Sequence, residues 1–362
     1  MLNKTEILDC TLRDGSYVNN FQFTKNDTKK ILNVLESSGI KYIEIGHGIG
    51  LGASRIQKFK ARESDKSYCR VASKVIKKAK WGVFCIPGVA SLDDIRMAKD
   101  YGVNFVRVGT NIENYKEQEK FVNLCKKLNI YVASNFMKSY LVSPKKFVRY
   151  VKAAHEFGSD LIYLVDSSGS MFPNEIEEYF YNIKKFNKKI KLGFHGHDNL
   201  GMSCANAFHA YKLGFNLIDV SMQGLGRSSG NTPLETFLCL LERAGIKKNI
   251  DKLKIMSFSE KEIAHIFTRK GLSSLDLISG MSYFHSSFMP GIEKVAKRYS
   301  VDPRLLIMEH CKKNRKNAKE IDLEIIAKKL FNKGKIGSWK RIYSHYYGTE
   351  QNDSIKRSTQ KK

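Results

Sequence analysis

Lys191-Leu192-Gly193-Phe194-His195-Gly196-His197 is the stretch that decides the fold, because an apolar run ends there in two histidines. In a β-strand, residues i and i+2 point to the same face, so a strand here turns both imidazoles toward one point. Such convergence suits a divalent cation. Asp14, which follows another short apolar run, offers a carboxylate to the same ion.

The residues after the two histidines place them at the end of a strand. Taken alone, a His-x-His pair is more often ordinary polar surface. Asp198, Asn199 and Gly201 follow directly, however, and indicate a strand that passes into a loop. Because binding and catalytic residues are concentrated on such loops, this position favours a site.

Strand-like runs alternate along the chain with amphipathic helical stretches, which is typical of βα units around a parallel sheet. Eight such runs are expected at Glu6 to Thr11, Lys41 to Gly46, Trp81 to Ile86, Asn104 to Gly109, Ile130 to Ser134, Asp160 to Asp166, Lys191 to His195 and Leu217 to Met222. The eighth following helix begins near Pro233. This α/β pattern predicts a (β/α)8 TIM barrel, and a doubly wound open sheet is the alternative.

Polar and glycine residues gather at the carboxyl ends of these strands. They are Asp14, His47, Gly109, Asp166, His195, His197 and the stretch Gln223 to Asn231. In TIM barrels that face carries the active site, so the clustering supports both the fold and the metal site.

The pattern changes after Ile250 to helices without strands between them. These helices are expected at Ser259 to Arg269, Pro290 to Tyr299, Asp302 to Cys311 and Asp322 to Asn332. We therefore expect a TIM-barrel catalytic domain over residues 1–250 and a small helical C-terminal accessory domain over 251–340. Residues 341–362 form a basic tail that we expect to be partly disordered.

The 362 residues carry a formal net charge of +26, which raises the question of nucleic-acid binding. The lysines are spread over helix-like stretches, and no nucleic-acid-binding motif accompanies them, so we expect a solvated basic surface and no specific nucleic acid. Seven scattered cysteines without a Cys-x-x-Cys pair suit a reducing cytoplasm. We expect neither a signal peptide nor a membrane span.

Five segments together resemble the 4-hydroxy-2-oxovalerate aldolases, a family of the HMG-CoA lyase-like, metal-dependent TIM-barrel lyases. They are Asp9-Cys10-Thr11-Leu12-Arg13-Asp14-Gly15, His47-Gly48-Ile49-Gly50-Leu51-Gly52, Val165-Asp166-Ser167-Ser168-Gly169, His195-Gly196-His197-Asp198-Asn199-Leu200 and Gly224-Leu225-Gly226-Arg227-Ser228-Ser229-Gly230-Asn231-Thr232-Pro233-Leu234-Glu235. Each segment alone is weak evidence for the family, but five segments in the same order are specific for it. Ser286-Ser287-Phe288 and Tyr299-Ser300-Val301-Asp302 resemble the aldolases' own accessory domain.

The resemblance implies a class II aldolase that cleaves a 4-hydroxy-2-oxo acid, such as 4-hydroxy-2-oxovalerate, to pyruvate and a short aldehyde. It implies that Asp14, His195 and His197 bind Mn2+ or Mg2+. Arg13 would share with this Lewis acid the charge that develops on the pyruvate enolate.

Three further residues are candidates for substrate binding. Ser167 lies in a matching segment, and Lys138 follows the fifth strand, where it could bind an acidic group of the substrate. Asn231 either caps the helix near Pro233 or lies behind the ion, and its position favours the cap.

Two positions depart from the family. Tyr17 stands where the aldolases carry a histidine, and His285 stands where they carry a tyrosine. We hypothesise that the two residues are exchanged. His285 would be the general base and Tyr17 would supply a hydrogen bond, because an imidazole removes a proton near neutral pH more readily than a phenol.

Two alternatives remain open at this point. The first is a related pyruvate-using aldolase or condensing enzyme with a different aldehyde or 2-oxo acid substrate, which the exchange of Tyr17 and His285 also fits. A non-catalytic barrel that binds anionic partners through its positive surface is the second alternative. The resemblance further implies an acylating aldehyde dehydrogenase as partner, and we expect a possible homo-oligomer.

Overall fold

The computed structural model describes residues 5–167, 169–227, 230–264, 274, 275, 278, 282, 284, 288–314, 317–335 and 337. Within them the chain forms two compact units, one within residues 1–238 and 249–269 and the other within residues 239–248 and 270–362. The domain limits expected from the sequence remain predictions.

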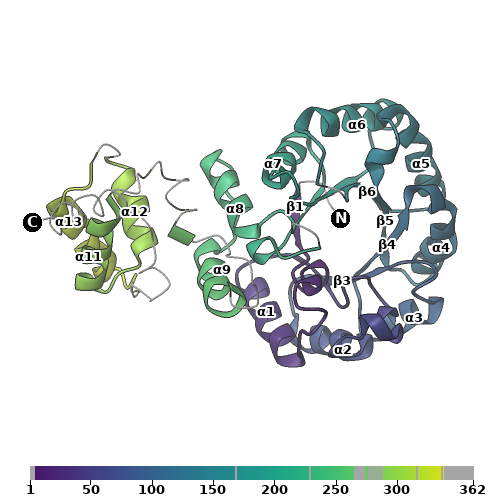
Figure 1. The fold of residues 1–362 in the computed structure, drawn as a ribbon, viewed down its shortest axis with the longest axis horizontal. Coiled ribbons are helices and arrows are strands. Elements are labelled where there is room, and N and C mark those ends of the chain that lie inside the picture. The colour runs from purple at the N-terminus through teal and green to yellow at the C-terminus, as the bar shows by residue number, and fades with distance from the viewer. Residues whose placement is uncertain are drawn as a thin grey trace, which may run out of the picture. The chain divides into compact units, whose positions relative to one another are not determined.

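The first unit is a closed barrel of eight parallel strands in sequence order, surrounded by helices (Figure 1). The strands are β1 (Glu6–Asp9), β2 (Tyr42–Ile45), β3 (Lys80–Cys85), β4 (Phe105–Asn111), β5 (Tyr131–Met137), β6 (Leu161–Asp166), β7 (Leu192–Gly196) and β8 (Leu217–Val220). Pairing of β1 with β8, with Asp9 opposite Val220, closes the sheet. The TIM-barrel prediction is confirmed, and the open sheet is excluded.

Helices follow the strands, and several of them begin where the sequence supplies a start signal. They are α1 (Lys25–Ser37), α2 (Asp65–Val75), α3 (Leu92–Asp100), α4 (Glu119–Lys127), α5 (Pro144–Glu156), α6 (Pro173–Phe186), α7 (Ser203–Leu213) and α8 (Leu234–Arg243). Thr24 and Ser91 each form a capping box with the aspartate three residues later. Proline opens α5 and α6, where its missing N–H costs nothing.

Alternate residues of each strand face the barrel interior. The interior contains a buried apolar cluster that reaches from the amino ends of the strands upward and consists of Leu8, Cys10, Tyr42, Phe105, Ala133, Leu161, Tyr163, Val165 and Leu217. Toward the carboxyl ends, buried charged residues replace these side chains: Glu44 on β2, Arg107 on β4, His195 on β7 and Asp219 on β8. The change from apolar to charged side chains marks the face where the site lies.

The sequence misplaced the first helix after the barrel. A helix α9 (Lys252–Phe258), capped by Asp251, precedes the Ser259 to Arg269 stretch, of which Ser259–Ile263 continues it as a π-helical turn. Residues 265–269 lie outside the described residues. The helical pattern starts earlier because Asp251 accepts a hydrogen bond from the Lys254 N–H, a cap that the sequence reading overlooked.

The described part of the second unit is helical, as the sequence predicts. It contains α11 (Met289–Tyr299), α12 (Pro303–Cys311) and α13 (Glu320–Asn332), packed through buried Ile292, Leu306 and Leu323. In the part of the chain that the structure covers, no helix combines the length and the apolar character needed to cross a bilayer.

Candidate metal centre

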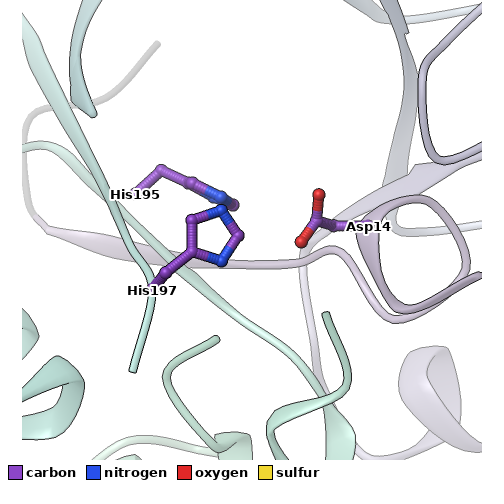
Figure 2. A group of neighbouring side chains, drawn as sticks. All are labelled: Asp14, His195 and His197. Atoms are coloured by element: carbon purple, nitrogen blue, oxygen red, sulfur yellow. The ribbon is translucent and has the colours of Figure 1, made fainter. Parts of the chain in front are cut away.

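Three side chains from distant parts of the chain converge at the carboxyl end of the barrel. Asp14 opens a short 3-10 helix (Asp14–Tyr17) after β1, His195 is the fourth residue of β7, and His197 follows that strand. One ligand atom from each of the three lies within 4.8 Å of the others, and all three residues are buried. Figure 2 shows the two imidazole rings and the carboxylate facing one another across a common space.

Hydrogen bonds on the far side of the two imidazole rings determine which ring nitrogen is available to an ion. His195 Nδ1 lies 2.8 Å from Asp219 Oδ2, and His197 Nδ1 lies 3.1 Å from the Gly230 carbonyl oxygen. Since a carbonyl oxygen only accepts, the proton of His197 belongs on Nδ1, which leaves Nε2 with a free lone pair. Burial lowers the pKa of His197 to about 4, against the opposing charge of Asp14, and keeps this ring neutral.

Asp14 is held as a carboxylate by the residue before it and by two residues of the loop after β8. Arg13 Nη1 donates to its Oδ1 at 2.5 Å, while Asn231 Nδ2 and the Arg227 N–H donate to its Oδ2 at 2.9 and 3.3 Å. Burial alone raises the pKa of Asp14, but the charge of Arg13, together with the hydrogen bond from Asn231, brings it well below its usual range. The group therefore presents a negative charge to a cation.

These donors fit a hard or borderline divalent ion. One carboxylate oxygen and two imidazole nitrogens leave coordination positions for water and substrate. The three ligand atoms lie within 4.8 Å of one another, and ligands at right angles on one ion with bonds of about 2.1 Å lie about 3 Å apart, so a bound ion would draw the side chains inward. The carboxylate and carbonyl behind the histidines supply the outer hydrogen bonds that metal-binding imidazoles ordinarily have.

A chain of buried ion pairs connects the ligands beneath the site. Arg13 Nε donates to Glu44 Oε2 at 2.6 Å, and Arg107 Nη1 donates to the same oxygen at 3.0 Å. Arg107 Nη2 donates to Asp219 Oδ2 at 2.6 Å, the oxygen that also contacts His195. This floor network of Arg13, Glu44, Arg107 and Asp219 thus runs from one side of the metal centre to the other.

Tyr163 packs against the floor network. Its hydroxyl donates to Asp219 Oδ1 at 2.8 Å, and its ring lies 4.1 Å from the Arg107 guanidinium carbon. Sequence reasoning missed Glu44, Arg107 and Asp219. A signal was available, because each is a charged residue at an inward position of an otherwise apolar strand, where an unpaired charge is very costly.

Tyr17 is the last residue of the short 3-10 helix that Asp14 opens. Its ring packs against Gly48, where an added Cβ would meet the ring at 2.7 Å, and against Phe21 with ring centroids 5.1 Å apart. Burial and the charge of Asp14 raise the pKa of Tyr17. The phenol is therefore a hydrogen-bond donor at neutral pH. His285 lies outside the described residues.

Asn231 does not cap a helix, because α8 begins three residues later at Leu234. Its Nδ2 donates instead to Asp14 and, at 2.8 Å, to the Leu225 carbonyl oxygen. Spacing favoured the cap, and the expectation failed because the glycine-rich loop folds back toward β1. Lys138 and Ser167 lie together, since the Lys138 N–H donates to Ser167 Oγ at 2.9 Å.

The comparisons with known proteins agree with this geometry. Residues 4–261 match the model of the HMGL-like family. A protein of Geobacillus genomosp. 3 named 4-hydroxy-2-oxovalerate aldolase is 31% identical over 304 residues, which cover 84% of this chain and 90% of that protein. Its namesake from Geobacillus thermodenitrificans is 33% identical and is covered to 89%.

Solved structures share the fold at lower identity. The HMG-CoA lyase of Bacillus subtilis superposes with a TM-score of 0.64 at 22% identity, over 76% of this chain and 97% of that one. The carboxyl transferase domain of Rhizobium etli pyruvate carboxylase gives 0.63 at 14% identity, over 91% of this chain and 60% of that one. Both structures are similar to this chain in their TIM-barrel fold.

Proposed function

The chain belongs to the HMGL-like family and is a carbon–carbon lyase, and from this premise we propose that it is a divalent-metal-dependent aldolase. The proposed reaction cleaves a 4-hydroxy-2-oxo acid, such as 4-hydroxy-2-oxovalerate, to pyruvate and a short aldehyde. The observation that carries the proposal is the convergence of Asp14, His195 and His197. We propose these three as the ligands of Mn2+ or Mg2+.

Breaking the bond between C3 and C4 places negative charge on the 2-oxo oxygen as an enolate forms. A bound divalent ion would supply Lewis-acid stabilisation of that charge. Arg13 provides a second positive group. Its Nε and Nη1 are occupied by Glu44, Asp14 and the Gly48 carbonyl oxygen, while Nη2 donates to none of the described residues. The guanidinium is therefore fixed in place, and its Nη2 group is available to the substrate.

Arg13 keeps its position during the reaction because its surroundings are buried and paired. Its guanidinium carbon lies 4.8 Å from the centre of the Phe84 ring, which supports it from below. A preorganised cation of this kind needs no rearrangement when the charge develops, and this is the main source of electrostatic catalysis.

Cleavage also needs a base for the 4-hydroxyl proton and an acid for the enolate carbon. We assign the base to His285 and a hydrogen bond to Tyr17, in keeping with the exchange of these residue types. The raised pKa of Tyr17 supports its part, because a phenol that stays protonated donates to an oxygen. Ser167, Asn231 and Lys138 complete the proposed substrate surroundings.

The direct test measures pyruvate release with lactate dehydrogenase across a panel of 4-hydroxy-2-oxo acids, with Mn2+ and with chelator. We expect cleavage that requires the metal and that falls at least a hundredfold in His197→Gln. Absence of metal-stimulated cleavage of every compound, together with steeply salt-dependent binding of anionic polymers, would favour the non-catalytic barrel instead.

The role of His285 has a separate test. We expect His285→Ala to lose at least a hundredfold in kcat while it binds Mn2+ like the wild type, since a base contributes that much to proton transfer. Rescue by added imidazole would support the assignment. Near-native turnover of His285→Ala would remove the residue from the mechanism.

We also propose an acylating aldehyde dehydrogenase as the acceptor of the aldehyde, a homo-oligomeric assembly and a cytoplasmic location. The family resemblance supports the partner. None of the seven cysteines, all of which lie within the described residues, is in a disulfide, which supports a reducing compartment. Gel filtration of the chain alone and with a candidate dehydrogenase tests the assembly and the partner.

A further inference from the structure

An arginine that the proposed reaction does not use lies at the mouth of the site. The Arg227 N–H donates to Asp14 Oδ2 at 3.3 Å, and its Nη2 donates to the Ser167 carbonyl oxygen at 2.8 Å. Its side chain therefore extends from the loop after β8 to the end of β6. After burial, its charge contributes to lowering the pKa of His197, so the guanidinium lies close to the metal centre.

Lys138 is a second cationic residue on the same part of the rim. It follows β5 in the left-handed region, with φ of 59°, and its backbone N–H donates to Ser167 Oγ. Its side chain is exposed. Arg227 and Lys138 thus hold Ser167 through its backbone and its side chain respectively, from neighbouring segments of the rim.

Neither cation is neutralised within the protein. In the ranges that the structure describes, no carboxylate forms an ion pair with Arg227 or with Lys138, whereas Arg13 and Arg107 each form two ion pairs with carboxylates at the site. Cationic side chains without a carboxylate partner beside a site attract anions. Their arrangement therefore calls for a negative group on the ligand.

The substrate's own 2-oxo acid end does not meet this requirement. In the proposed function that end is bound by the ion and by Arg13, on the floor side of the site. Arg227 and Lys138 lie on the rim, where the aldehyde-derived half of the substrate must extend. A short uncharged aldehyde such as acetaldehyde would leave both cations without a partner.

The geometry points to an anion subsite at Arg227, Lys138 and Ser167 that recognises a carboxylate or phosphate on the aldehyde-derived half of the substrate. This inference rests on the proposed function and narrows its substrate class to 4-hydroxy-2-oxo acids with a second negative group. Arg227 is the principal specificity residue, because a guanidinium binds such oxygens with two parallel N–H groups.

The test compares two six-carbon probes by calorimetry in the presence of Mn2+. 2-Oxoadipate carries a second carboxylate and 2-oxohexanoate does not, and neither has the 4-hydroxyl group that cleavage needs. We expect the full-length wild type to bind 2-oxoadipate at least tenfold more tightly. In Arg227→Met this ratio falls to within threefold of unity, while Lys138→Met reduces it less.

Arg227→Met leaves the backbone donor to Asp14 in place, so it isolates the guanidinium. The matched control is Arg149→Met, which removes an exposed arginine of α5 and keeps the wild-type ratio if the preference does not come from net charge. Condensation of pyruvate with succinic semialdehyde or with glyceraldehyde 3-phosphate, each against propanal, then distinguishes a carboxylate from a phosphate.

The outcomes separate the subsite from the reaction. Equal binding of both probes by the wild type, or an unchanged ratio in Arg227→Met, overturns the subsite alone. Weaker binding of both probes in Arg227→Met at a constant ratio assigns Arg227 to the shared carboxylate and also overturns it. If neither probe binds in the presence of Mn2+, the proposed function fails together with the subsite.

Discussion

Asp219 shows how one buried carboxylate can serve several groups at once. Its Oδ2 contacts both His195 Nδ1 and Arg107 Nη2, and its Oδ1 accepts from Tyr163. Burial raises the pKa of Asp219, but Arg107 and then His195 outweigh that effect and lower it. The residue therefore holds the His195 ring by a charge, and its positioning role should be measurable through the metal.

We predict that Asp219→Asn weakens Mn2+ binding by about 10- to 100-fold, because outer-shell partners of metal-binding histidines contribute that much. Tyr163→Phe, which removes only the bond to Oδ1, should weaken it by less than threefold. Electron paramagnetic resonance of free Mn2+ gives both affinities. The control is Asp160→Asn, because Asp160 lies just before the amino end of β6, away from the site. Wild-type Mn2+ affinity in Asp219→Asn would refute the positioning role.

At the scale of elements, glycines on adjacent strands make room for the aromatic rings of the interior. An added Cβ would lie 2.2 Å from Phe105 at Gly82, 2.2 Å from Phe84 at Gly109 and 2.6 Å from Tyr163 at Gly193. In each strand pair, the ring on one strand thus fills the space left by the glycine on its neighbour. Because Phe84 and Tyr163 also pack against the arginines of the floor network, strand packing and site geometry are coupled.

We predict that Gly193→Ala destabilises the protein by about 1 to 3 kcal/mol, since overpacking a tight interior costs that much. It should also weaken Mn2+ binding, because the displaced Tyr163 ring supports Asp219. Urea unfolding and metal titration measure the two effects. Gly291→Ala on α11, where the nearest atom would be 3.5 Å away, should be neutral or stabilising. Equal effects at both positions would contradict the packing argument.

The elements of the barrel could be predicted because their patterns are local. β-Branched runs at regular intervals located all eight strands to within about three residues, and the ends of those strands located Asp14, His195 and His197. Asn231 was a candidate for which the spacing favoured a helix cap, and Arg227 was not singled out, because the roles of both depend on how the loop after β8 folds back on β1. Glu44 and Asp219 pair with Arg107 across the barrel, a contact that no sequence period specifies.

At the scale of the whole molecule, buried carboxyl groups make stability depend on pH. Asp9 is fully buried, and burial raises its pKa to about 7 despite two hydrogen bonds from Thr11. Between its ordinary value of 3.8 and 7, the folded protein keeps a proton that the unfolded chain releases. The contribution of Asp9 to stability therefore falls as pH rises through this window, and the full penalty is present above pH 7.

We predict that Asp9→Asn, which is neutral at every pH, is about as stable as the wild type near pH 4 and gains about 1 to 4 kcal/mol relative to it by pH 8. Urea unfolding at several pH values measures this difference. Asp93→Asn on the exposed face of α3 is the control and should show no such trend. A difference that shrinks as pH rises would show that Asp9 is ionised at a low pH in the folded protein.

Metal binding should also be visible in the stability of the molecule, because the three proposed ligands come from β1 and β7 and meet only when the barrel is closed. An ion that binds the folded state alone stabilises it by about 2.7 kcal/mol at a hundred times its dissociation constant. For a unit of this size we predict a rise in Tm of about 5 to 10 °C with Mn2+, reversed by chelator. His197→Gln should abolish the rise, whereas His155→Gln, on the exposed surface of α5, should keep it. A rise of equal size in His197→Gln would show that Mn2+ binds elsewhere, and an unmoved wild-type Tm would contradict a metal centre assembled by folding.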